Sequence, residues 1–123
     1  MADSTLTYDK LLLEGPFKTF NNLTLASGEN VVAGEVVAYN TSTDKVESYD
    51  SGGSNGVNEF YGIAVEAVDA STGDKNISVY IGGTFGIAGL TFGTSGDSAT
   101  QAFINKAREL GCILKTAVKE DGS

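Results

Sequence analysis

The side chains that most often carry catalysis are scarce in this chain. It contains no histidine and one cysteine, Cys112, among 123 residues. Without imidazole there is no Ser-His-Asp triad and no imidazole metal ligand, and a single thiolate cannot form a zinc site. Cys112 follows the end of an expected helix, where the helix dipole disfavours a thiolate. We therefore interpret Cys112 as a small core residue, and we expect no metal and no cofactor.

Carboxylates are the other groups that could supply an acid and a base or bind calcium. Sixteen Asp and Glu residues stand against eight Lys and Arg residues, a net charge of -8. At this density some carboxylates must be neighbours by chance, and we expect them on a solvated surface. They include Glu66 and Asp69, Asp44 and Glu47, and Asp74. No EF-hand spacing is present. A hydrolase that uses two carboxylates is the weakest hypothesis.

The charge distribution excludes several classes of partner. The eight basic residues are scattered along an acidic chain, so we expect no nucleic-acid binding and no attraction to anionic membranes. No apolar run approaches the roughly 20 residues that span a bilayer. The first ten residues, MADSTLTYDK, lack the basic and apolar regions of a secretory signal, and this leads us to expect synthesis in a reducing cytoplasm.

The glycine-rich segment 82–96 could suggest a phosphate-binding loop. Gly83, Gly86 and Gly89 follow one another at intervals of three residues, with no lysine nearby. Neither G-x-x-x-x-G-K-[ST] nor G-x-G-x-x-G occurs, so these glycines are interpreted as turn-forming or close-packing positions.

Eleven aromatic residues could form a platform for sugars. Phe60, Phe92 and Phe103 lie in apolar contexts typical of a core. The tyrosines occupy strand positions where a hydroxyl can reach water; they are Tyr8, Tyr39, Tyr49, Tyr61 and Tyr80. A carbohydrate- or cell-surface-binding β module is therefore a second hypothesis for the function.

Sixteen glycines and one proline predict one small domain, mainly β, with frequent turns and one short C-terminal helix. Strands are expected at 17–25, 35–39, 46–49, 60–68, 77–81 and 112–118, with a hairpin turn at 40–44. The strand at 60–68 should be buried on both faces and should form a hairpin with 77–81, in which Ile77, Val79 and Ile81 share one face.

The single helix is expected over 98–110. Ser98 and Gln101 have capping-box spacing, and Gly111 is placed to end the helix. One face of this helix should cover the sheet with Ala99, Phe103, Ala107 and Leu110.

Residues 1–16 differ from the rest because they lack glycine until Gly15 and contain the triplet Leu11–Leu13. Two interpretations have about equal weight: a local strand packed on the domain, or an apolar segment that binds a partner.

A series of short motifs resembles the head decoration proteins of lambda-like tailed bacteriophages. The motifs are AGEVVAY at 33–39, KV at 45–46, YGIAVEAVDA at 61–70 and VYIGGTF at 79–85, and their order carries the resemblance over residues 17–118. The resemblance implies a non-enzymatic, barrel-like or tulip-like β domain at 17–118, with a flexible N-terminal arm at 1–16 and a polar tail at 119–123.

The resemblance also implies a function and partners. Such proteins are made in the host cytoplasm, form homotrimers and bind the major capsid protein at local three-fold positions outside the expanded head, where they cement capsomers against DNA pressure. In this chain Leu6, Tyr8, Leu11 and Leu13 would be the alternating capsid contacts of the arm. The composition of the arm departs from the Ala- and Pro-containing arm associated with lambda.

Overall fold

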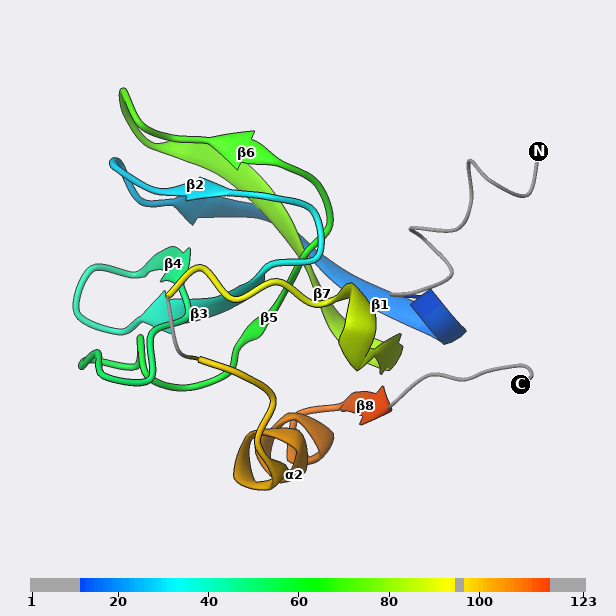
Figure 1. Ribbon diagram of the computed structural model, residues 1–123. Coiled ribbons are helices and arrows are strands. Elements are labelled where there is room, and N and C mark those ends of the chain that lie inside the picture. The colour runs from blue at the N-terminus through cyan, green and yellow to red at the C-terminus, as the bar shows by residue number, and fades with distance from the viewer. Residues whose placement is uncertain (1–11, 95–96, 116–123) are drawn as a thin grey trace.

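The computed structural model describes residues 12–94 and 97–115 and shows a mainly β fold with one short C-terminal helix (Figure 1). The elements in chain order are β1 (Leu12–Leu25), β2 (Asn30–Val31), β3 (Val36–Asn40), β4 (Lys45–Ser48), β5 (Gly62–Ala64), β6 (Val68–Asp69), β7 (Lys75–Gly86), the 3-10 turn η1 (Ile87–Gly89), α2 (Gln101–Glu109) and β8 (Cys112–Lys115). The predicted fold class is confirmed.

Five strands close into a ring. The main sheet has the order β1-β4-β3-β5-β7-β8, and β1 also pairs with β7. Closure depends on the length of β1, which is antiparallel to β7 from Leu12 to Leu25 and meets β4 only at its last residue. The small β2–β6 sheet lies at the end of the molecule away from α2 (Figure 1).

The core has two apolar clusters because β3 and β5 are buried on both faces. Val37 packs with Ile77 and Val79 in one cluster, whereas Val36 packs with Phe103 and Phe85 in the other. The second cluster lies beneath α2 and β8, and their apolar side chains cover the outside of the ring. As predicted, Ile77, Val79 and Ile81 contact the same cluster.

The predicted strand at 60–68 is wrong as a continuous element. Only Gly62–Ala64 pairs in the main sheet, with β3 and β7, and this part is buried on both faces as expected. After Ala64 the chain bends, Glu66 and Ala67 become exposed, and β6 pairs with β2 instead. An apolar run therefore identified the central strand, but a change of partner strand ended it early.

The predicted start of the helix is also wrong. Thr100 is the N-cap, and its hydroxyl accepts a hydrogen bond from the Phe103 N–H at 3.3 Å, so the helix begins at Gln101 and not near Ser98. Its end is confirmed: Gly111 has φ of +103° and its N–H donates to the Arg108 carbonyl. Phe103 and Ala107 are buried, but Leu110 is 47% exposed because it lies at the C-cap, outside the helical register.

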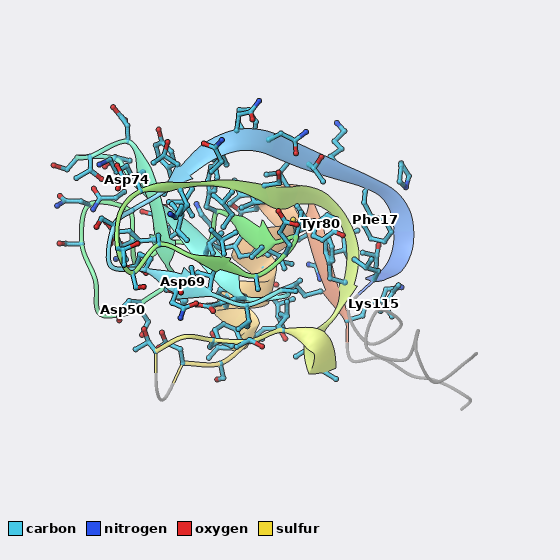
Figure 2. The ribbon with its side chains drawn as sticks, turned by 90° about the horizontal axis from the view of Figure 1, so that it is seen from above. Phe17, Asp50, Asp69, Asp74, Tyr80 and Lys115 are labelled. Carbon is cyan, nitrogen blue, oxygen red and sulfur yellow. The ribbon has the colours of Figure 1, made fainter. Side chains whose placement is uncertain are left out.

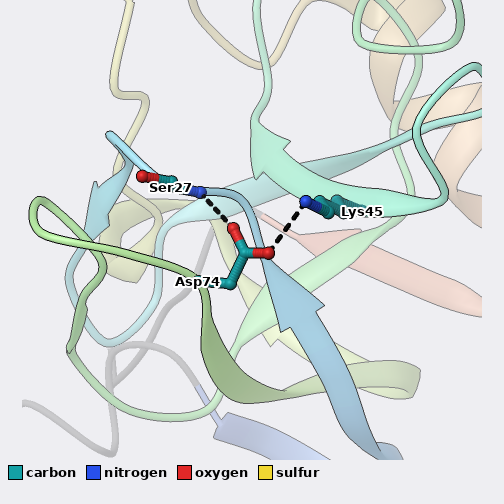
Figure 3. Close-up of polar contacts among 3 residues, drawn as sticks. All are labelled: Ser27, Lys45 and Asp74. Carbon is teal, nitrogen blue, oxygen red and sulfur yellow. Dashed lines mark hydrogen bonds and ion pairs between the residues drawn. The ribbon is translucent and has the colours of Figure 1, made fainter.

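Asp74 joins three parts of the chain at one end of the ring (Figure 3). Its carboxylate accepts a hydrogen bond from the Ser27 N–H at 2.8 Å and forms an ion pair with Lys45 at 2.8 Å. These partners hold the pKa of Asp74 below its usual value, the hydrogen bond with Lys45 having the largest effect. The carboxylate fixes the turn after β1 and the start of β4 beside β7, which is a structural task.

Candidate functional site

Three strands lie side by side where the chain enters and leaves the described fold. Leu12 of β1 is in register with Phe85 of β7, and Phe85 is in register with Leu114 of β8. Phe85 and Leu114 are buried, and Leu12 packs against the same cluster. This row therefore points into the core, and alternation along β7 and β8 directs Thr84 and Ile113 to the opposite face.

The outward residues include two apolar side chains. Leu13 is 38% exposed and Ile113 is 40% exposed. On β7, Thr84 is in register with Ile113 on one side and with Glu14 on the other, and Leu13 is the extra residue of a β-bulge next to the Glu14–Thr84 pair. We call Leu13, Thr84 and Ile113 the β1–β8 surface. Because β8 ends the strand order, its outer edge has no partner strand among residues 12–94 and 97–115. An open edge of this kind offers main-chain groups to an added strand.

An aromatic cluster holds the start of β1 against β7. The ring of Phe17 lies 5.8 Å from that of Tyr80 and 5.4 Å from that of Phe85, centroid to centroid. The approach is possible because Gly83 has no side chain: a Cβ there would lie 2.5 Å from Phe17 Cδ1. Phe17 thus anchors the strand next to the β1–β8 surface.

The four predicted arm residues fall into two groups. Leu6, Tyr8 and Leu11 lie outside the described residues, whereas Leu13 belongs to β1. Residues 12–16 of the expected arm form the beginning of β1. At this point the chain has features of both interpretations of the leucine triplet, a local strand packed on the domain and an apolar segment that binds a partner. Leu12 packs on the core, as a local strand would, while Leu13 is exposed, as a contact residue would be.

The residues with possible chemistry are not brought together. Within the described ranges no group of three or more Asp, Glu and Cys side chains could hold a metal. Cys112 is fully buried, and burial raises its pKa to about 11, so it is a core residue as predicted. A hydrogen bond with the Ser71 side chain and, next, the one that the Ser71 N–H donates at 2.9 Å hold the pKa of the Asp69 carboxyl below its usual value.

The tyrosines differ in how much of each residue is exposed. Tyr49 is only 9% exposed and packs edge-on against Phe103 in the core. Tyr39 and Tyr61 are half-buried and form a ring pair, and Tyr80 is half-buried beside Phe17. Tyr8 lies outside the described residues. Phe60 and Phe103 are buried, as predicted, and Phe92 packs against the same cluster.

Glu35 is a buried carboxylate that the sequence does not reveal. It is 4% exposed and accepts hydrogen bonds from the Ser48 hydroxyl at 2.6 Å and from the Val32 N–H at 3.1 Å. A Cβ on Gly93 would lie 2.6 Å from its Oε2, so the glycine-rich segment closes over it. The carboxylate fixes β3, β4 and the segment after η1 together, and a single Glu at a strand start gives no signal for such a role.

Acidic and apolar features lie toward different ends of the molecule. Asp50, Asp69 and Asp74 lie toward one end, whereas Phe17 and Lys115 lie at the other, near the start of β1 and the end of β8 (Figure 2). The β1–β8 surface is therefore away from the acidic turns. No helix among the described residues is long and apolar enough to cross a membrane.

Comparison with known proteins adds one finding to this geometry. A family model described as "Bacteriophage lambda head decoration protein D" matches residues 2–111. No curated protein matches the chain significantly. The matched region includes the whole of α2 and all of the strands except β8. It also includes the ten residues before β1. The chain belongs to the bacteriophage lambda head decoration protein family, whose members are structural proteins of the phage capsid.

Proposed function

We propose that the protein is a homotrimer that binds the outer surface of the expanded head at local three-fold positions and holds neighbouring capsomers together. Its partner is the major capsid protein, contacted by the N-terminal segment that contains Leu6, Tyr8, Leu11 and Leu13. The proposal rests mainly on the exposed Leu13 and Ile113 at the point where residues 2–11 join the sheet.

The physical basis of binding is strand addition with apolar side chains on one face. Main-chain hydrogen bonds supply affinity without special side-chain chemistry, and Leu13 and Ile113 add apolar area. A subunit that binds only the expanded shell stabilises it by mass action, by about 4 kcal/mol per site at a free concentration near 1,000 times Kd. Repetition over many sites turns this term into a large stabilisation of the shell.

The charge of the protein suits the outer surface of a capsid. A trimer carries three copies of the net charge of -8, which keeps unbound trimers apart and soluble. The same charge repels nucleic acid, so we propose no contact with the packaged genome and no membrane contact. No catalytic step is part of the proposed function, and synthesis takes place in the host cytoplasm.

The test is co-sedimentation of the protein with expanded and with unexpanded shells. We expect binding to expanded shells only, and light scattering should give the free protein three times the 12.7 kDa of one chain. Deletion of residues 2–11 should abolish co-sedimentation and leave the trimer mass unchanged. This deletion stops short of Leu12, so that the pairing of β1 with β7 is retained.

Point variants locate the contact on the fold. Leu13→Ser and Ile113→Ser each remove an exposed apolar side chain from the β1–β8 surface, and each should weaken shell binding about tenfold. Val32→Ser is the matched control, because Val32 is 46% exposed but lies between β2 and β3. Equal binding by the deletion variant and the full chain would remove the N-terminal segment from the mechanism.

A further inference from the structure

A second surface feature shares no residue with the β1–β8 surface. It is an open hollow of about 360 Å³ between the end of β3, the turn at 55–56, the segment before β5 and the C-terminal half of α2. Tyr39 and Tyr61 line it together with Thr41, Glu59 and Lys106. Its volume is at the lower end of the range for small-molecule sites.

Two aromatic rings form an apolar wall of the hollow. The ring centroids of Tyr39 and Tyr61 are 5.2 Å apart, and their planes are inclined by 34°. Both side chains are half-buried, so part of each ring faces solvent. Paired rings of this kind present a broad apolar area with hydroxyl groups at its margin.

The opposite wall is held in place by the backbone. The Asn55 carbonyl accepts hydrogen bonds from both the N–H and the hydroxyl of Thr41, at 2.8 Å and 3.1 Å. Gly56 has φ of +92°, and a Cβ there would lie 2.5 Å from the Tyr39 carbonyl oxygen. The turn therefore packs directly on the end of β3, and the hollow exists before any ligand binds.

Polar groups at the hollow are free to bind a ligand. Neither Glu59 nor Lys106 forms an ion pair or a side-chain hydrogen bond within the described part of the chain. Both side chains are exposed. One carboxylate and one ammonium line the same hollow, so acceptors and donors are available and the local charge is balanced.

We propose that this hollow binds a neutral saccharide, a mono- or disaccharide unit of a longer glycan. The apolar faces of a sugar ring fit the paired tyrosine rings, and its hydroxyl groups can both donate to Glu59 and accept from Lys106. A charged ligand would leave one of these two side chains facing a like charge. A wholly apolar ligand would leave both without hydrogen-bond partners in the hollow.

The experiment is an NMR titration of the full-length protein with six named sugars: D-glucose, D-galactose, D-mannose, N-acetyl-D-glucosamine, maltose and lactose. We expect at least one of them to shift the amide signals of Tyr39, Gly56 and Tyr61 in a saturable manner. Tyr39→Ala and Tyr61→Ala should each weaken this binding about tenfold, whereas Tyr61→Phe, which keeps the ring, should have a smaller effect.

The control variant is Phe20→Ala, which removes an aromatic ring that is 49% exposed on β1 and should leave sugar binding unchanged. If an alanine variant does not fold, Glu59→Gln and Lys106→Ala test the same hollow at exposed side chains and should weaken binding about threefold or more. The proposal is overturned if no sugar produces a saturable shift, or if the shift is unchanged in a variant that combines Tyr39→Ala with Tyr61→Ala. It is also overturned if the tyrosine variants change the oligomeric mass, because the hollow would then be a contact between subunits.

Discussion

Gly83 determines how closely β1 and β7 pack at the base of the β1–β8 surface. Its φ of +129° is one that residues with a side chain rarely adopt, and the Phe17 ring occupies the space of a Cβ. Between the pairs Lys18–Gly82 and Thr19–Tyr80, β7 advances two residues while β1 advances one, which is a β-bulge. The glycine lies next to this bulge and allows β7 to change the face that it buries.

Gly83→Ala should therefore destabilise the fold by about 2 to 3 kcal/mol, because the backbone is strained and the Phe17 ring must move. Urea unfolding at neutral pH measures the loss. Gly73→Ala is the matched control, since a Cβ at Gly73 meets nothing within 4 Å, and it should change the stability by less than about 0.5 kcal/mol. Equal losses for the two variants would contradict the packing argument.

Because of Cys112, we expect the free energy of unfolding to change with pH in the alkaline range. Burial raises its pKa from 9.0 to about 11, so the unfolded chain loses the thiol proton at a lower pH than the folded chain. The stabilisation is complete below pH ~9 and is lost as the pH rises through ~11, about 2 to 3 kcal/mol in all.

Unfolding of the wild type and of Cys112→Ala across this pH range measures the effect. The difference in stability between the two proteins should shrink as the pH rises. Burial also raises the pKa of Tyr49 and Tyr61, but both proteins contain these tyrosines, so their effect cancels in the comparison. Parallel pH curves would show that the Cys112 thiol does not ionise differently in the two states.

The sequence predicts the role of a single residue well when that role depends only on neighbours in the sequence. The close-packing role of Gly83 and the buried position of Cys112 both follow from residue type and neighbours. Glu35 and Tyr49 do not, because their burial depends on segments distant in sequence. Glu35 meets Ser48 and the chain at Gly93, and Tyr49 meets Phe92 and Phe103.

At the scale of elements, residue types and periodicity predict that a strand or helix exists more accurately than they predict where it begins and ends. The hairpin of β3 and β4 is confirmed, with Val37 opposite Ser48 and Asn40 opposite Lys45. The run at 60–68 has the composition of a buried strand throughout, yet where it stops depends on which strand it meets next. Such a partner change is a tertiary effect that no local pattern contains.

The start of α2 gives an element-scale prediction. Thr100→Ala removes the hydroxyl that accepts from the Phe103 N–H and should cost about 1 kcal/mol. Ser98→Ala changes the other candidate cap, an exposed residue two positions earlier, and should cost less than about 0.5 kcal/mol. Chemical denaturation of both variants measures the two losses in stability. A larger loss for Ser98→Ala would show that Ser98, and not Thr100, is the N-cap of α2.

At the scale of the whole molecule, ring closure is the feature that the sequence conceals. The strand expected at 17–25 is correct in type, but closure requires β1 to begin at Leu12 and to follow β7 along its length. Leu13 alone among the four predicted contact residues lies in the described fold. Its partner on the exposed surface, Ile113, is a hundred residues away in sequence, and only the shared neighbour β7 brings the two together.

Ring closure separates two tasks of the N-terminal segment, and two truncations test this. Deletion of residues 2–11 should leave the midpoint of thermal unfolding unchanged, because the pairs that close the ring begin at Leu12. Deletion of residues 2–16 also removes the pairing of Leu12 with Phe85 and the packing of Leu12 on the core.

The longer deletion should lower the midpoint by about 5 °C or more, since 1 kcal/mol shifts a small domain by about 4 to 8 °C. Calorimetry of the three proteins at one protein concentration makes the comparison, because any self-association also raises thermal stability. If the shorter deletion lowers the midpoint as much as the longer one, residues 2–11 contribute to the fold itself. Loss of shell binding in that variant would then reflect a weakened subunit and not a lost contact.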